Sequence, residues 1–274
     1  MRTITQTQIR AYERCRRLYY LQYIRELVWP VSRTVPSEIK RGNDFHLLAR
    51  QLLLGFPRET LVLPDDNGMM ERWLDNFQRE QPAWGCGRIV TEKEVSALYA
   101  GVLWLGKYDA LAVDGDHLTI FDWKTGTHRA DAASYLKSPQ TRLYRFLAKY
   151  IGPRLIGKED IPAENIRMIY WFAEHSDWQI CLPYSEQAYQ EDLTWLDMKA
   201  HEMSSEEEKD YPPSGNKNRC GKCGYCTYCF PEMAENTGAG LNERAAAADP
   251  EYVFQEEFPF FGMSPDDDQA DINF

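Results

Sequence analysis

The sequence lacks a long apolar run. Among its 274 residues no stretch approaches the roughly 18 consecutive apolar positions that indicate a transmembrane helix. The N-terminal residues MRTITQTQIR also lack the apolar segment of a secretory signal. Disorder is disfavoured by the composition, which is 43% hydrophobic and 13% aromatic. We therefore expect a cytoplasmic protein with a packed core.

Basic residues are missing from the end of the chain. Residues 249–274 carry eight acidic residues and no Lys or Arg, whereas residues 1–50 carry ten basic residues against four acidic ones. The net charge of −11 is therefore unevenly distributed: residues 1–50 are basic, which suits nucleic-acid binding, and residues 249–274 are acidic. We expect one domain over residues 1–231 and an acidic, flexible tail over 232–274. That tail is either a solvating end or a segment with a binding role.

The cysteines do not suggest disulfides, because a cytoplasmic chain keeps its thiols reduced. Four of the seven cysteines lie within ten residues of one another, at Cys220, Cys223, Cys226 and Cys229. This density indicates a bound metal ion or cluster. Cys86 and Cys181 are expected to be ordinary buried thiols.

The spacing of apolar residues predicts an α/β fold. Stretches with helical periodicity alternate with stretches rich in Val, Ile, Leu, Tyr and Trp, and the turn Asp114-Gly115-Asp116 predicts a hairpin. This order predicts a mixed sheet with flanking helices. The expected helices cover residues 5–27, 37–55, 68–80, 138–150 and 185–203, and the expected strands cover 87–99, 102–113, 117–123, 166–173 and 177–183.

Two aspartates and a lysine stand out in residues 106–126, GKYDALAVDGDHLTIFDWKTG. Asp109 lies on one expected strand, and Asp122 and Lys124 share one face of its hairpin partner, with Trp123 on the other face. Two carboxylates there offer the hard oxygen ligands that Mg²⁺ or Mn²⁺ prefers. A lysine beside the metal can orient a metal-activated water or donate to a phosphate. The pattern indicates phosphodiester hydrolysis, although an exposed ion pair on a strand has the same spacing.

Four further residues extend this set. His46 lies on the expected helix over 37–55, and Glu94 lies on the strand over 87–99. Gln140 and Tyr144 are four residues apart and share one face of the helix that begins at residue 138. Each of these residue types, taken alone, is more common as a packing or surface residue. Only the order of the whole set along the chain indicates a site.

In that order the residues resemble the PD-(D/E)XK nuclease superfamily, in particular its RecB-like branch, which includes CRISPR adaptation nucleases and the nuclease domain of AddB. The resemblance rests on His46, Gly106-x-x-Asp109, Asp122-x-Lys124 and Gln140-x-x-x-Tyr144. It implies a restriction-endonuclease-like mixed β-sheet core flanked by helices. The implied roles are metal binding by His46, Asp109, Asp122 and the Trp123 backbone carbonyl, with Glu94 as a further candidate, catalysis by Lys124, and positioning of DNA or of the lysine by Gln140 and Tyr144.

The cysteines add to the resemblance. Relatives with a cluster carry a cysteine in an aromatic first helix, matched by Cys15 in AYERCRRLYYLQY, and a Cys-x2-Cys-x5-Cys ending, matched by Cys220, Cys223 and Cys229. The resemblance implies that these four hold a 4Fe–4S cluster, which would tie the first helix to the end of the domain. Cys226 departs from the pattern, so it can replace Cys15 in the set, and a zinc ion is the alternative to the cluster.

The resemblance implies an Mg²⁺- or Mn²⁺-dependent DNA nuclease, an exonuclease on single-stranded DNA or DNA ends in repair, recombination or defence. The alternatives are a non-catalytic DNA-end-binding scaffold of a helicase–nuclease complex and a CRISPR adaptation nuclease that trims DNA before integration. Arg10, Arg14 and Arg17 recur at helical spacing and are candidate DNA contacts.

The end of the chain, FGMSPDDDQADINF, is similar to the acidic, Phe-ending tail of bacterial single-stranded-DNA-binding proteins. Such a tail would dock on a repair partner or occupy the protein's own DNA channel. The expected partners are thus DNA and a helicase, a single-stranded-DNA-binding protein or CRISPR adaptation proteins, with no membrane.

Overall fold

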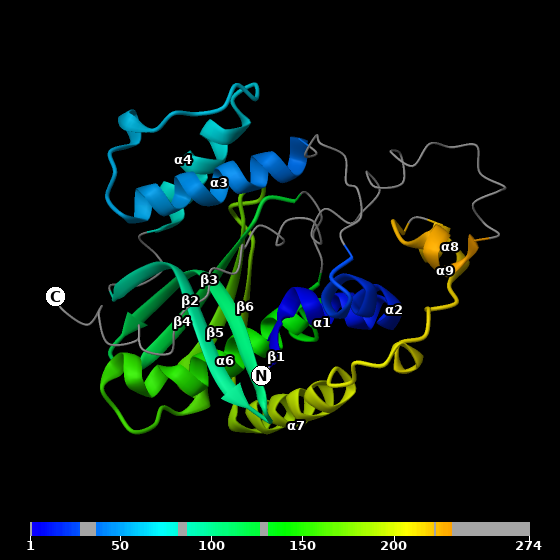
Figure 1. Cartoon of the computed structure of the whole chain (residues 1–274). Helices are drawn as coiled ribbons and strands as arrows, with labels where there is room; N and C mark the ends of the chain where they lie inside the picture. The colour runs from blue at the N-terminus through cyan, green and yellow to red at the C-terminus, as the bar shows by residue number, and fades with distance from the viewer. Residues whose placement is uncertain (1, 28–36, 82–86, 127–130, 222, 232–274) are drawn as a thin grey trace.

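The computed structural model describes residues 2–27, 37–81, 87–126, 131–221 and 223–231 (Figure 1). In these residues the strands form a six-stranded mixed sheet with helices on both faces. The mixed α/β class predicted above is confirmed. The strands are β1 (Arg2–Thr5), β2 (Arg88–Tyr99), β3 (Val102–Asp114), β4 (His117–Lys124), β5 (Ile166–Phe172) and β6 (Gln179–Pro183).

Strand β3 pairs with three other strands of the sheet. It has β2 along one side, and β1 followed by β4 along the other. β2 runs antiparallel to it from the Arg88↔Val113 pair to the Tyr99↔Val102 pair. On the other side, β1 pairs in parallel with the start of β3 and β4 pairs antiparallel with its end. The β3–β4 ladder stops at the Ala110↔Phe121 pair, whereas on its other side β4 pairs with β5 from Leu118 to Lys124. The two strands therefore separate just where Asp109 and Asp122 lie.

One face of the sheet is covered by α3 (Ser37–Leu53) and α4 (Met69–Glu80), and the other by α6 (Pro139–Ile156), α7 (Glu186–Glu202) and α1 (Gln6–Arg14) (Figure 1). Under α3 and α4, the ring of Phe77 lies 5.2 Å from that of Trp123, centroid to centroid. The other helices are α2 (Arg16–Tyr19), α5 (Ala132–Leu136), α8 (Lys217–Gly221), α9 (Cys226–Cys229), the π-helix Tyr20–Ile24 and the 3-10 turns Arg58–Thr60, Ala163–Asn165 and Glu208–Asp210.

Helix α6 crosses the sheet beside the β3–β4 separation, and its ends follow from its sequence. Ser138 accepts a hydrogen bond from the Thr141 backbone N–H, and Pro139 occupies the first turn, where no N–H is needed. Gly157 ends the helix with φ +68°, a conformation that costs glycine little. A Cβ on Gly106 of β3 would lie 2.8 Å from the Leu147 side chain, so the glycine lets α6 pack directly on the strand.

The expected helix over residues 5–27 begins as predicted, with Thr5 as its cap, but it is interrupted once, and a strand before it was not predicted. Arg2–Thr5 form β1, which pairs with a strand far along the chain and has no local signal. Cys15 is extended, with φ −165° and ψ 116°, and separates α1 from α2. The helix expected over 138–150 continues to Ile156, whereas the other predicted elements agree within a few residues.

In the described part of the chain, no helix is both long and apolar enough to cross a membrane. The predicted tail over 232–274 lies outside the described residues.

Candidate active site

The candidate site lies where β3 and β4 separate. At Asp109 the backbone ladder is replaced by a side-chain contact, because the Trp123 backbone N–H donates to Asp109 Oδ2 at 2.7 Å. The Trp123 side chain packs on the opposite face, as the alternation of strand side chains predicted. Asp109 on β3 and Asp122 on β4 therefore lie on either side of the split, and the separation leaves room between the strands for polar groups.

Asp122 is buried, with 5% of its surface exposed, and is held from two directions. Gln140 Nε2 on α6 donates to Asp122 Oδ1 at 2.6 Å, and Lys124 Nζ lies 3.0 Å from Asp122 Oδ2. Lys124 Nζ also donates to Gln140 Oε1 at 3.3 Å. The contact between Lys124 Nζ and Asp122 Oδ2 is an ion pair, and within the described part of the chain no group donates a well-aligned hydrogen bond to Oδ2. The sequence-predicted Asp122, Lys124 and Gln140 thus form one connected network.

Burial raises the pKa of Asp122 to about 6, and the nearby Asp109 charge adds to this rise. Lys124 and His46 act in the other direction, because their positive charges favour the carboxylate. The protein therefore holds a carboxylate in a place that is electrostatically unfavourable without a further cation.

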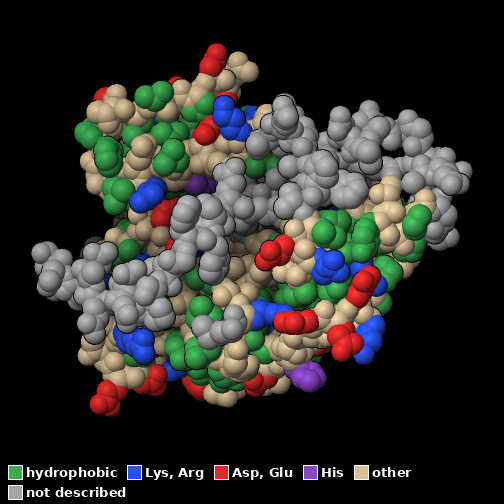
Figure 2. Space-filling model, in the orientation of Figure 1, with side chains coloured by type: hydrophobic (Ala, Val, Ile, Leu, Met, Phe, Trp, Pro, Cys, Tyr) green, Lys and Arg blue, Asp and Glu red, His purple; other side chains and the backbone are tan. Residues whose placement is uncertain are grey.

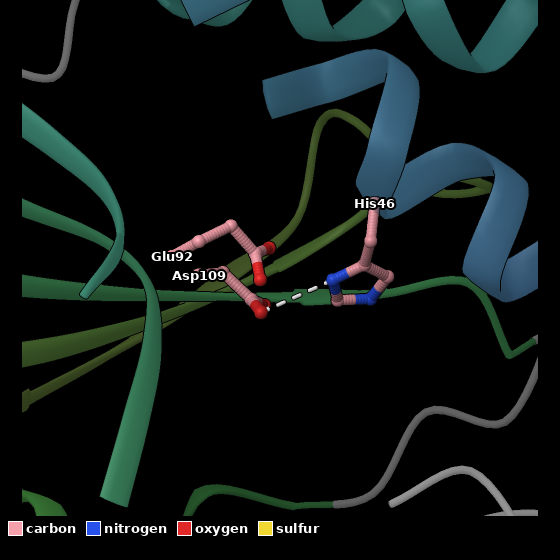
Figure 3. A group of neighbouring side chains, drawn as sticks. All are labelled: His46, Glu92 and Asp109. Carbon is pink, nitrogen blue, oxygen red and sulfur yellow. Dashed lines mark hydrogen bonds and ion pairs between the residues drawn. The ribbon is translucent and has the colours of Figure 1, made fainter. Parts of the chain in front are cut away.

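A second group of ligands lies beside this network. The ligand atoms of His46, Glu92 and Asp109 lie within 4.8 Å of one another, and among the described residues this is the only group of three or more His, Cys, Asp or Glu side chains that meets so closely. Figure 3 shows Glu92 and Asp109 pointing from the sheet toward His46 on α3. His46 Nδ1 lies 3.1 Å from Asp109 Oδ1. Figure 2 shows a recess between the α3–α4 layer and the sheet in which a histidine is visible.

The pKa of His46 is raised although burial alone would lower it. The charge of Asp109 and its hydrogen bond outweigh burial, and the charges of Asp122 and Glu92 act in the same direction. In the protein without a metal, a protonated His46 would donate its Nδ1 proton to Asp109. A positive charge is therefore favoured at this point in the site.

The glutamate in the group is Glu92, not the predicted Glu94. Glu94 is exposed and lies outside the group. Both residues have the same parity on β2, so simple alternation does not tell them apart. The difference arises because Val95 packs in one core and Ile89 in the other, so that β2 changes face near Glu92, whose φ is +51°. A left-handed conformation is uncommon for a non-glycine residue.

A sequence signal for Glu92 did exist. Ala100 and Gly101 form the two-residue turn between β2 and β3, with φ values of +51° and +76°. The pairs Thr91↔Ala110 and Lys93↔Tyr108 follow from this turn, so Glu92 lies opposite Asp109. Counting back from an Ala-Gly turn would have selected Glu92.

Tyr144 and Arg10 border the network from the helices. Tyr144 is buried on α6, and burial, followed by the charges of Asp122 and Asp109, raises its pKa. Arg10 Nη2 on α1 donates to Gln140 Oε1 at 3.4 Å, which brings the first helix to the site. Arg14 and Arg17 lie elsewhere, since Arg14 lines the cavity among the cysteines and Arg17 pairs with Glu208.

The cysteines gather at the other end of α1, where α8 and α9 lie beside α2 (Figure 1). They line a cavity of about 30 Å³. Burial and the proximity of Cys15 and Cys220 raise the pKa of the Cys223 thiol. Burial, then the charges of Cys223 and Cys15, raise that of Cys229 to about 11. The residues that line the cavity include all five candidates, namely Cys15, Cys220, Cys223, Cys226 and Cys229.

The expectation for Cys181 is wrong, because this thiol is exposed on edge strand β6, and Cys86 lies outside the described residues.

The comparison with protein families decides the family. The sequence model of the PD-(D/E)XK nuclease superfamily matches residues 3–230. The chain belongs to the PD-(D/E)XK nuclease superfamily. Its fold is similar to the crystal structure of a protein from Eubacterium rectale described as a candidate exonuclease, with a TM-score of 0.55 and 11% identity over 86% of this chain and 94% of that chain. No curated protein matches the chain.

The donor set of this superfamily member fits a hard divalent cation. Glu92 and Asp109 offer carboxylate oxygens, His46 offers a ring nitrogen, and Asp122 Oδ2 is buried without a hydrogen-bond donor. Oxygen-rich sets with one imidazole suit Mg²⁺ or Mn²⁺ better than soft metals. Burial is the main cause of the raised pKa of Asp122, and the charge of Asp109 adds to the rise at both Asp122 and His46, so a cation beside Asp109 would neutralise negative charge that acts on both groups.

Proposed function

We propose that the protein is an Mg²⁺- or Mn²⁺-dependent deoxyribonuclease of the RecB-like type that acts on single-stranded DNA or DNA ends. The observation that carries the proposal is the junction of two groups at the β3–β4 separation: a ligand set (His46, Glu92 and Asp109) and a buried Asp122–Lys124–Gln140 network. A metal bound by that set, with Asp122 and the Trp123 carbonyl as further ligands, would stabilise charge on the phosphate and lower the pKa of its water.

The chain's own residues have separate tasks in this proposal. The Trp123 N–H fixes the orientation of the Asp109 carboxylate, which leaves Oδ1 on the side of His46. Gln140 holds both Asp122 and Lys124, and Lys124 Nζ would orient the attacking water or donate to the phosphate. Tyr144 remains protonated at all working pH values, since its pKa is raised, and would support this network from α6.

Of the three arginines predicted to contact DNA, Arg10 is the one that lies close to the site. Arg10 touches Gln140 and would contact the DNA backbone beside the cleaved phosphate. Arg14 and Arg17 would contact DNA further from the site, beside the cysteines.

We also propose that the cysteines bind a 4Fe–4S cluster. After burial, the charges of Cys15 and Cys220 raise the pKa of both the Cys223 and the Cys229 thiol, and Cys226 is not among these causes, which favours the set of Cys15, Cys220, Cys223 and Cys229. Thiols with raised pKa values lose their protons when a metal binds, so a cluster would relieve their crowding. A zinc ion would use the same cysteine ligands, but the zinc protein would be colourless and would contain zinc in place of iron.

A cleavage assay tests the enzyme directly. End-labelled single- and double-stranded DNA would be incubated with the protein in EDTA, Mg²⁺ or Mn²⁺. We expect metal-dependent cleavage that falls by at least about a hundredfold in Asp109→Asn, because the variant loses a ligand charge. The matched control is Asp114→Asn, at the exposed end of the same strand.

Cleavage by Asp109→Asn at the wild-type rate would reject the site. Metal-independent DNA-end binding with no cleavage by any preparation would instead favour a scaffold subunit.

A further inference from the structure

Lys107 is a second lysine at the ligand set, and the mechanism above does not use it. It lies on β3 two residues before Asp109, and its Nζ forms an ion pair with Glu92 Oε2. About a third of the Lys107 side chain is exposed, 31%, against 19% for Glu92. Lys107 thus approaches the set from the solvent side, whereas Lys124 lies in the buried network.

We propose that Lys107 is a counter-ion that competes with the divalent cation for Glu92, and so sets the metal concentration at which the site fills. This inference rests on the proposed function. Without a metal, three carboxylates (Glu92, Asp109 and Asp122) lie close to one another, and each is balanced by a different cationic partner. Lys107 balances Glu92, His46 balances Asp109, and Lys124 balances Asp122.

The Lys107 ammonium and a divalent cation would compete for Glu92 because both are positively charged. The Lys107 ammonium touches a carboxylate whose ligand atom lies within 4.8 Å of those of His46 and Asp109. A divalent cation among these atoms would therefore lie close to a fixed positive charge, and the two would repel each other. Because Lys107 is partly exposed, its ammonium can turn toward solvent at small cost, which the buried Lys124 cannot.

The backbone at Glu92 supports this assignment. Its φ of +51° is an uncommon, strained conformation for a non-glycine residue, and such conformations persist where surrounding contacts hold them. The pair with Lys107 is one such contact in the protein without a metal. A metal ion would replace it, so that Glu92 is held in either state.

The test is a titration of the full-length protein with MnCl₂, without DNA, in which free Mn²⁺ is followed by electron paramagnetic resonance. Wild type, Lys107→Gln, Glu92→Gln and the double variant would be compared. The matched control is Lys93→Gln, which removes the same charge from an exposed residue next to Glu92. Far-ultraviolet circular dichroism would confirm that each variant is folded.

We expect Lys107→Gln to bind Mn²⁺ about tenfold more tightly than wild type, because a nearby positive charge is removed. Lys93→Gln should change the affinity by less than about twofold, since its charge is screened by solvent. In the Glu92→Gln background the Lys107 substitution should have little effect, because the two residues act as a pair.

Weaker Mn²⁺ binding by Lys107→Gln would overturn the proposal and identify Lys107 as a support that orients Glu92. Equal effects of Lys107→Gln and Lys93→Gln would overturn it as well. The proposed function is tested separately in the same titration by Asp109→Asn. If wild type binds Mn²⁺ and Asp109→Asn does not, the metal site is upheld whatever Lys107 does; if wild type binds none, both proposals fall.

Discussion

The two polar centres of this protein both contact the first helical segment, one through Arg10 of α1 and the other through Cys15 after it, and they differ in how they are held. At the β3–β4 separation, Asp109 and Asp122 each accept a hydrogen bond of 2.6–2.7 Å, and their cationic partners are in place. At the cysteine cavity, burial and the neighbouring thiols raise the pKa values of Cys223 and Cys229. One centre is already organised by hydrogen bonds and ion pairs of the protein, whereas our proposal assigns the other to a bound cluster that would hold its sulfurs together. Loss of metal should therefore have different consequences at the two places.

The largest expected effect is on stability at the cysteine centre. Cys15→Ser should remove the visible absorbance and iron of the purified protein and lower its stability by about 3 kcal/mol, the order found when a crosslink across a long loop is lost. Thermal unfolding and iron analysis would measure this. Cys181→Ser, at an exposed strand position, is the control.

The same measurements distinguish the two candidate ligand sets. If Cys226→Ser loses the iron and Cys15→Ser keeps it, the cluster belongs to the four C-terminal cysteines. Zinc in place of iron in wild type would reject the cluster and leave the ligands to be assigned by the same variants.

The second effect is on activity and separates the two glutamates of β2. Glu92→Gln should lower the cleavage rate by about a hundredfold, because it removes a charged candidate ligand, while the fold remains stable. Glu94→Gln, two residues away and exposed, should leave the rate unchanged. Equal losses of cleavage rate in the two variants would mean that β2 pairs with β3 in a different register in the active protein.

The third effect is on the buried network. Gln140→Ala removes the amide that joins Asp122 to Lys124 and should lower the rate about tenfold with little change in Mn²⁺ affinity, because it positions groups instead of binding metal. Gln187→Ala, an exposed amide of α7 that bonds Glu191, is the control. An unchanged rate in Gln140→Ala would show that the network is only structural.

The smallest effect is a gain in stability. The pKa of Asp122 is raised to about 6, so the folded protein binds a proton there more tightly than the unfolded chain does. Ionised Asp122 therefore costs stability; the cost is absent below the ordinary carboxyl range and is fully present above about pH 6. In EDTA at pH 7.5, Asp122→Asn should raise the free energy of unfolding by about 1 kcal/mol and so unfold at a higher temperature than wild type. This gain should vanish near pH 4. A lower unfolding temperature for Asp122→Asn at pH 7.5 would contradict this account.

Local patterns in the chain were sufficient for much of the site. The Asp114-Gly115-Asp116 turn and strand alternation placed Asp122 and Lys124 on one face, and the structure joins both to Gln140. The order of His46, Asp109 and Asp122 along the chain also indicated the superfamily. These features depend on spacing within a few residues, which a sequence shows directly.

By itself, then, the sequence determined the mixed α/β class, the hairpin that carries Asp109, Asp122 and Lys124, and the group of cysteines. Only the tertiary structure decided that Glu92, and not Glu94, lies beside His46 and Asp109, that Arg10 reaches Gln140, and that the first residues add a parallel strand to β3. The physical reason is that periodicity reports which face of an isolated element is apolar. The twist of two long strands, a change of face at one residue and contacts between distant segments depend on the whole packed sheet.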